Sequence, residues 1–429
     1  MGRDGGADDR WDTGCVEVKI LMAIPHDIYY EPWTTRPVEL SEAFVRMGHD
    51  VTLYYWPVPD DPPRFPRTRV EAPHCVRTVA AVGRHSEYYA NLRRLVHLAK
   101  DADVVEFQKC LPYCSVPSML CARILGKPVC YDWDDNESSI VREWQPSSTF
   151  GAFVYALERL LPRFVTTLCV SSQALKDKAR ALGVSDDCIF DAPVGATLAR
   201  FNPKDDGAEV RERYGIDGLL VVYMGQLQGA SYGDLFLRAG GIVAKQWPGV
   251  YFMVVGGGER LPMLRSASEA LGLGPRLSFT DYVPHEHIPR YLAAADIGVA
   301  TFERNETTIC KSPLKIVEYL AAGTPIVASD VGDVRKMVGD AGIVVEPGDP
   351  EPIAEAISRL LSDEGLRARL SVAGRRRAEG VYNWEATARN MLAAFSKALE
   401  LGPRHRAMPR FITKRLDNGT MLTESNGEG

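Results

Sequence analysis

Short apolar runs alternate along the chain with segments of helical periodicity. Residues 16–24 form an apolar run that ends at Pro25, which predicts a buried strand. Residues 37–47 place apolar side chains at helical spacing, and residues 51–55 alternate between apolar and polar positions as a second strand. A strand, a helix and a strand in this order are typical of the start of a parallel, doubly wound sheet.

The same alternation continues in two successive sets. In the first set, further strands are expected at residues 103–107, 128–132, 164–170 and 188–193. A linker of proline, glycine and charged residues follows at about 201–207. In the second set, strands are expected at residues 219–224, 250–255, 276–279, 297–300, 326–328 and 342–345. Two such sets predict two Rossmann-like domains that face one another, with ligands in the cleft at the carboxyl ends of the strands.

Residues 311–330 combine a polar helix start, a glycine stop and a short strand. Ser312 is expected to cap the helix with its hydroxyl, and Pro313 to occupy the first helical position. Gly323 is expected to end the helix in the left-handed conformation. Such a helix start attracts anions, because its free N–H groups and the helix dipole point the same way. Glu318, inside this helix, is suited to accept hydrogen bonds from sugar hydroxyls.

This arrangement resembles the donor-binding end of retaining GT-B glycosyltransferases of glycosyltransferase family 4. The family pattern is a Glu, seven residues, a second Glu, and a helix that ends in Ala-Ala-Gly followed by Thr or Lys and Pro. Glu318 matches the second Glu and residues 321–325 match the helix end, whereas Cys310 stands in the place of the first Glu. The alternative is an ordinary strand–helix unit in which Glu318 is merely solvated.

The resemblance covers both sets of strands and implies an α/β fold of the GT-B type, with two Rossmann-like doubly wound parallel-sheet domains facing across a cleft. The parts expected are a flexible N-terminus at 1–14, an acceptor domain at 15–203, a donor domain at 204–382, a helix at 383–402 that crosses back to the first domain, and a tail at 403–429.

The residues of the donor site are carried over from the same resemblance. Glu318 would hold the ribose and is assigned to catalysis, while the backbone near Tyr282 would pair with the nucleobase. The implied donor-binding residues are Gly225, Gln226, Ser231, Gly257, Gly258, Tyr282, Val283, Cys310, Lys311, Ser312, Pro313, Leu314, Lys315 and Glu318.

Two cations of the family pattern are missing. Gln226 stands where the family has an Arg, and Ser231 stands where it has a Lys. In the family, this Arg and this Lys neutralise the donor diphosphate. The helix start at Ser312, with Lys311 and Lys315 beside it, is expected to compensate. Each charge-assisted hydrogen bond contributes roughly 1.5–3 kcal/mol, so a few of them can replace the lost pair.

Cys310 replaces the carboxylate that would hold hydroxyls of the donor sugar. A thiol is a poor acceptor, so the resemblance implies a changed sugar or a substitute such as Glu303 or Glu306. The alternative is a buried cysteine that fills space.

Residues 131–135 place Asp132, Asp134 and Asp135 directly after a strand. Read alone, three carboxylates in four residues invite a metal site. The resemblance implies no metal, because GT-B enzymes generally need none. It matches Asp134 to a histidine that faces the reacting sugar, so Asp134 is assigned to catalysis, with capping of the next helix as the alternative. Asp132, Asp135, and His26 and Tyr30 of the first strand–helix loop are the acceptor-side residues expected.

The composition of the chain bears on its binding partners and on its cellular compartment. The chain has 429 residues, of which 45% are hydrophobic and 25% charged, with a net charge of −6. This charge argues against a nucleic-acid-binding protein. No stretch approaches the ~20 apolar residues that span a bilayer. Nine cysteines in mostly apolar surroundings suit reduced thiols in a cytoplasm.

The segment at residues 64–100 is basic, with eight Arg and Lys against two Glu. Tyr88 and Tyr89 are interleaved with these charges. This composition suits an anionic acceptor or peripheral contact with a membrane surface, and it equally suits a solvated helix face.

We therefore expect a cytoplasmic glycosyltransferase that uses no cofactor. It would move a sugar from a nucleoside diphosphate sugar to a small metabolite or a cell-surface glycan precursor, with retention of configuration, and a homodimer is allowed. Two alternatives stay open: a nucleotide-sugar epimerase or hydrolase on the same fold, and a catalytically silent protein that binds nucleotide sugars. The donor base, the sugar and the acceptor atom do not follow from the sequence.

Overall fold

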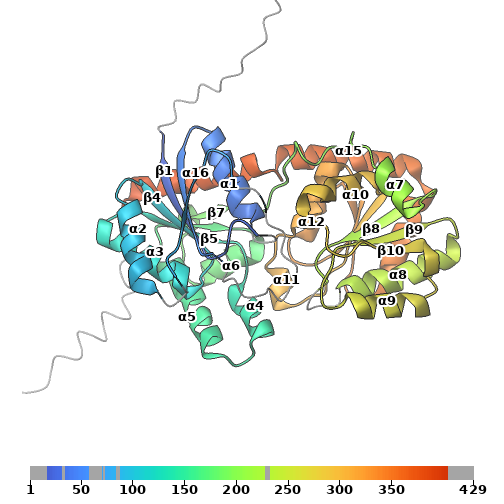
Figure 1. Ribbon diagram of the computed structural model, residues 1–429, viewed down its shortest axis with the longest axis horizontal. Coiled ribbons are helices and arrows are strands. Elements are labelled where there is room, and N and C mark those ends of the chain that lie inside the picture. The colour runs from blue at the N-terminus through green and yellow to red at the C-terminus, as the bar shows by residue number, and fades with distance from the viewer. Residues whose placement is uncertain are drawn as a thin grey trace, which may run out of the picture.

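The computed structural model describes residues 17–30, 34–57, 70, 73–83, 87–227 and 232–403. Two parallel β-sheets lie side by side, each with helices on both faces (Figure 1). The prediction of two Rossmann-like, doubly wound domains is therefore confirmed. None of the helices in the described part of the chain has the length and apolar composition that crossing a bilayer requires.

The first sheet has seven parallel strands in the order β3-β2-β1-β4-β5-β6-β7. Their bounds are β1 Lys19–Ile24, β2 Asp50–Tyr55, β3 Arg77–Ala80, β4 Val104–Gln108, β5 Val129–Trp133, β6 Thr167–Val170 and β7 Ile189–Asp191. β4 and β5 are buried along their whole length, as expected when helices cover both faces of a parallel sheet. The strand order reverses between β1 and β4, so this edge is the switch point of the domain.

The second sheet has six parallel strands in the order β10-β9-β8-β11-β12-β13. Their bounds are β8 Leu220–Met224, β9 Tyr251–Val255, β10 Leu277–Phe279, β11 Ile297–Ala300, β12 Ile326–Ser329 and β13 Gly342–Val345. Here the order reverses between β8 and β11. Ligand sites in such sheets form beyond the carboxyl ends of the strands at this point.

Helices connect most of the strands. Those of the first domain are α1 Thr35–Arg46, α2 Tyr88–Leu98, α3 Pro112–Leu125, α4 Glu137–Trp144, α5 Thr149–Phe164 and α6 Gln173–Ala181. The following ones are α7 Ala208–Tyr214, α8 Tyr232–Gln246, α9 Leu261–Ala270, α10 Ile288–Ala294, α11 Glu306–Ile309, α12 Leu314–Ala322, α13 Val334–Val338, α14 Pro350–Ser362, α15 Glu364–Gly380 and α16 Trp384–Leu401.

Helix α16 packs on the first domain although it follows the second in sequence (Figure 1). Trp384, Met391 and Phe395 of α16 share one hydrophobic core with Phe44 of α1. The two chain segments that pass between the domains meet at Gly195, where an added Cβ would lie 2.3 Å from the carbonyl carbon of Asn383. This close approach requires glycine, and it holds both crossings side by side.

Candidate functional site

Hydrogen bonds connect the two domains near the start of α12. Two of them involve the loop before this helix. Ser172 Oγ donates to the carbonyl of Cys310 at 2.7 Å. The Val194 N–H donates to Ser312 Oγ at 3.2 Å. The start of α12 is therefore fixed against the first domain, and the candidate site lies at this junction.

The helix start differs from the sequence prediction in one respect. Pro313, and not Ser312, occupies the cap position of α12, and the helix has no side-chain cap. Ser312 Oγ is instead the acceptor for Val194 of the first domain. Leu314 is the first helical residue, and Gly323 ends the helix at φ 69°, as predicted. The first turn of α12 therefore keeps N–H groups that no side chain satisfies.

Lys315 lies in an aromatic pocket at the end of β8. Its Nζ is 4.5 Å from the ring centroid of Tyr223 and 5.5 Å from that of Phe302. A Cβ added at Gly225 would lie 2.6 Å from the same Nζ, so this glycine makes room for the ammonium. No carboxylate lies within ion-pair distance of Lys315 in the described residues. Burial, followed by the charge of Lys311, lowers the pKa of Lys315 to about 7, although Glu318 acts in the opposite direction.

Glu318 is buried and already has a partner that sequence reasoning missed. Its Oε1 lies 2.5 Å from His285 Nε2. His285 Nδ1 lies 3.2 Å from Arg200 in the connection between the domains. Arg200 in turn pairs with Glu39 of α1 at 3.4 Å. A chain of four polar side chains thus links the candidate ribose carboxylate to the first domain, and no motif in the sequence marks it.

The glycines after β9 pack against backbone of the same domain. Added Cβ atoms would lie 2.1 Å from Gly225 O at Gly256, 2.3 Å from Asp281 Oδ1 at Gly257 and 2.4 Å from Leu227 O at Gly258. These glycines therefore let the loops after β8 and β9 lie side by side. Gln226 is in the described part of the first of these loops, and Ser231 lies outside the described residues.

Tyr282 and Val283 line a cavity of about 300 Å³ between the loop after β10 and helices α7 and α10. The Tyr282 N–H donates to Asp281 Oδ1 at 2.7 Å, so Asp281 occupies one backbone group that was expected to face a nucleobase. The cavity walls also include Tyr214 and Tyr291.

Cys310 was expected to be part of the donor site, with a buried, space-filling cysteine as the alternative. It is buried and belongs to the hydrophobic core of the first domain. The space-filling alternative is therefore the one the structure supports. Glu306 is also occupied, since it pairs with Arg142 at 2.7 Å and Lys178 at 3.5 Å.

Asp132 is not an exposed acceptor-side group. Arg36 of α1 holds it with two hydrogen bonds, Nε–Oδ2 at 2.8 Å and Nη2–Oδ1 at 2.7 Å. Burial alone would lower the pKa of Arg36, but the charge of Asp132 raises it above its usual range. Beside this pair, both oxygens of Glu106 are buried without a hydrogen-bond partner among the described residues. Burial, and then the charge of Asp132, raises the pKa of Glu106 well above its usual range.

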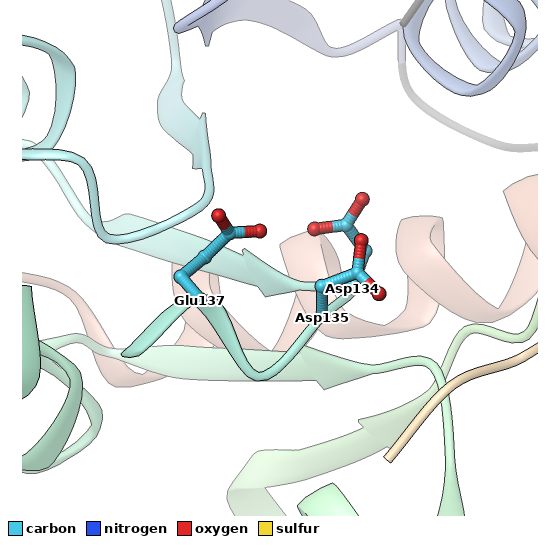
Figure 2. A group of neighbouring side chains, drawn as sticks. All are labelled: Asp134, Asp135 and Glu137. Atoms are coloured by element: carbon cyan, nitrogen blue, oxygen red, sulfur yellow. The ribbon is translucent and has the colours of Figure 1, made fainter. Parts of the chain in front are cut away.

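Asp134 and Asp135 lie on the turn between β5 and α4, and Glu137 is the first residue of α4 (Figure 2). Asp134 does not cap α4, because Glu158 of α5 accepts from the Glu137 N–H at 2.7 Å. Burial and the neighbouring carboxylates raise the pKa of Asp134 to about 6, with Lys109 acting against them. Asp134 therefore changes its charge near neutral pH. This is the range in which a general base is most useful.

The remaining acceptor-side candidates lie in the loop that follows β1. His26 and Tyr30 are both half-buried there. In the basic segment, residues 64–69, 71–72 and 84–86 lie outside the described residues. In α2, Tyr89 is exposed and Arg93 stacks over its ring at 5.9 Å. Contact of this segment with a membrane stays a prediction.

Two sequence-family models match the chain. Residues 34–190 match the glycosyl transferase 4-like domain, and residues 218–363 match glycosyl transferases group 1. Alpha-D-kanosaminyltransferase of Streptomyces kanamyceticus is 32% identical over 167 residues, which cover 38% of this chain and 42% of that protein. D-inositol 3-phosphate glycosyltransferase of Geodermatophilus obscurus is 33% identical over 241 residues, which cover 52% and 51%. The chain thus spans about half the length of these curated relatives.

Solved structures share the fold over nearly the whole chain. Anabaena HepE in complex with UDP-glucose aligns with a TM-score of 0.67 and 16% identity, covering 89% of this chain and all of that one. Sucrose-phosphate synthase of Thermosynechococcus elongatus aligns with a TM-score of 0.65 and 20% identity, covering 94% of this chain and all of that one. The predicted GT-B fold is confirmed.

The Arg36–Asp132 pair generates a prediction about stability. We expect Arg36→Met to lower the free energy of unfolding by about 3–5 kcal/mol, because it leaves the buried Asp132 without its cation. Arg376→Met, in an exposed pair with Asp340, is the matched control and should cost less than about 1 kcal/mol. Calorimetric melting of both variants measures the difference. An equal loss of unfolding free energy in the two variants would show that the buried pair stabilises the fold no more than the exposed pair does.

Proposed function

The chain belongs to the group 1 glycosyl transferases, and on this premise we propose that it transfers a sugar from a nucleoside diphosphate sugar to a small polar acceptor. We further propose that the transfer retains the anomeric configuration and uses no metal. The observation that carries the proposal is Lys315, a half-buried ammonium without a carboxylate partner among the described residues, at the end of β8.

Lys315 is the residue that we propose to replace one of the two cations missing from the family pattern. The family's Arg would follow Gly225, where this chain has Gln226. Lys315 reaches the same place from α12, since its Nζ lies against Gly225. In this proposal, α12 supplies the positive charge that the family pattern places on the loop after β8. The same helix also offers uncapped N–H groups. A diphosphate between them would meet an ammonium and a helix start together.

Glu318 is suited to hold the ribose from the same helix. His285 engages Oε1, which leaves Oε2 to accept from a sugar hydroxyl. Because Glu318 is buried and held by His285, its carboxylate is already in position before the donor binds. Preorganised acceptors of this kind lose little entropy on binding.

The acceptor would approach from the first domain, where Asp134 is 12% exposed. One curated relative is named D-inositol 3-phosphate glycosyltransferase, which supports a small polar acceptor here. In the proposed reaction the protein mainly orients both substrates and stabilises the charge of the leaving diphosphate. Asp134 would orient the reacting hydroxyl or accept its proton.

A panel of UDP, GDP and dTDP sugars, each with and without acceptor, tests this function. We expect product only when donor and acceptor are both present, detected by mass spectrometry. Turnover without acceptor would indicate a hydrolase or epimerase. Tight donor binding with no turnover would indicate a binding protein.

Removing the ribose carboxylate provides the first prediction for this site. We expect Glu318→Ala to lower kcat/KM by about 10- to 100-fold, the equivalent of one charge-assisted hydrogen bond, while the fold stays intact. Glu379→Ala, on the exposed side of α15, is the control and should leave kcat/KM unchanged. Unchanged activity in Glu318→Ala would remove Glu318 from the site.

The pKa of Lys315 generates a prediction about pH. Because this pKa is lowered to about 7, the free protein carries a mixture of amine and ammonium at neutral pH. A bound diphosphate favours the ammonium, so binding takes up a proton above pH 7. The affinity for the nucleoside diphosphate should therefore fall as pH rises from 7 to 9, by up to about tenfold per pH unit.

Isothermal titration across this pH range measures the effect. The matching nucleoside, which has no phosphates, is the control and should bind with little pH dependence. An affinity for the diphosphate that stays constant from pH 7 to 9 would contradict the role of Lys315.

A further inference from the structure

Three carboxylates converge on one point at the carboxyl end of β5 (Figure 2). One oxygen each from Asp134, Asp135 and Glu137 lies within 4.8 Å of the others. Oxygen atoms gathered in this way are what a divalent cation requires. In this chain the position is already occupied by the side chain of Lys109.

Lys109 Nζ lies 3.2 Å from Asp134 Oδ1, 3.0 Å from Asp135 Oδ2 and 2.5 Å from Glu137 Oε1. An ammonium has three N–H donors and no acceptor. Lys109 Nζ donates hydrogen bonds to Asp135 and Glu137, and Asp134 completes the group as an ion pair. Because three carboxylates surround the ammonium, any effect that Lys109 has on the reaction passes through them.

The backbone at Lys109 is unusual. Lys109 follows β4 directly and adopts φ 61°, the left-handed region that non-glycine residues rarely enter. Its N–H still donates to the carbonyl of Asp132 on β5 at 3.1 Å. The hydrogen bonding between β4 and β5 thus continues to Lys109, although the chain turns toward α3 at this residue. Such conformations persist where the surrounding structure holds them in place.

Asp134 is the partner that Lys109 affects most directly at the cleft. Lys109 lies on its Oδ1, and Gln108 Nε2 donates to its Oδ2 at 3.0 Å. Gln108 thus holds one oxygen of the Asp134 carboxylate by a hydrogen bond, and Lys109 faces the other as an ion pair. Glu137 is nearly buried and anchors the opposite side of the ammonium.

We propose that Lys109 is the positioning residue of the acceptor side, and that its ammonium takes the place of a divalent cation among these carboxylates. It holds Asp134 toward the reacting sugar and excludes metal from the group. The role of Asp134 rests on the proposed transferase function, whereas the exclusion of metal does not. The two parts can therefore fail separately.

Metal binding tests the second part without any assay of activity. We expect Lys109→Met, which keeps the length of the side chain but removes its charge, to bind one Mn²⁺ per chain. The affinity should be at least tenfold tighter than any binding by the wild-type protein, measured by calorimetry and by the Mn²⁺ electron paramagnetic resonance signal. Lys100→Met, an exposed lysine at the end of α2, is the control and should gain nothing.

Two further variants keep the test interpretable if Lys109→Met does not fold. Lys109→Arg keeps a cation and should gain no Mn²⁺ site. Lys109→Met with Glu137→Gln removes one buried negative charge together with the ammonium, so it should fold even if the single variant does not, and it should bind Mn²⁺ more weakly than Lys109→Met. A folded Lys109→Met protein that binds no Mn²⁺ would overturn the exclusion of metal.

Activity tests the first part. Lys109→Met should lose at least tenfold in kcat with little change in donor KM, and Mn²⁺ should restore part of the loss. Wild-type activity should be unaffected by EDTA. An unchanged kcat in Lys109→Met would overturn the positioning role, and Mn²⁺ binding by the wild-type protein that EDTA reverses with loss of activity would overturn the exclusion of metal. Absence of transferase activity in the wild type would instead count against the proposed function.

Discussion

The donor half of the proposed site depends on one half-buried ammonium that no carboxylate neutralises in the described part of the chain. Lys315 is enclosed by Tyr223 and Phe302 and lies against Gly225. A charge removed from water is unfavourable unless something compensates for it, and the lowered pKa of Lys315 expresses this. A diphosphate would supply the missing partner. The site is thus incomplete without an anion, which is the property expected of a phosphate-binding group.

A lysine lies in the proposed site in each domain, but the surroundings of the two lysines differ. In the first domain, Lys109 is surrounded by three carboxylates. In the second domain, Lys315 has no carboxylate within ion-pair distance among the described residues. Both residues stand at the carboxyl end of a sheet near the point where the strand order reverses. The chain from Glu39 through Arg200 and His285 to Glu318 connects α1 of the first domain with α12 of the second.

The sequence was sufficient for features that depend on local pattern. The strands of both sheets, the stop of α12 at Gly323 and the place of Glu318 inside that helix follow from periodicity and turn chemistry. It missed β3, whose four residues are exposed or half-buried and show no clear alternation. The errors at the site come from contacts between distant segments. Asp132 pairs with Arg36, 96 residues away, and Ser312 accepts from Val194 of the other domain.

Binding of a nucleoside diphosphate to Lys315→Met, compared with the wild type and with Lys315→Met/Gln226→Arg, tests the central claim most directly. The account predicts that the single variant binds about 10- to 100-fold more weakly, as expected for one lost charge-assisted contact to phosphate. It predicts that the double variant, which restores the cation in the loop, recovers part of the loss. Equal affinity in the wild type and Lys315→Met would contradict it.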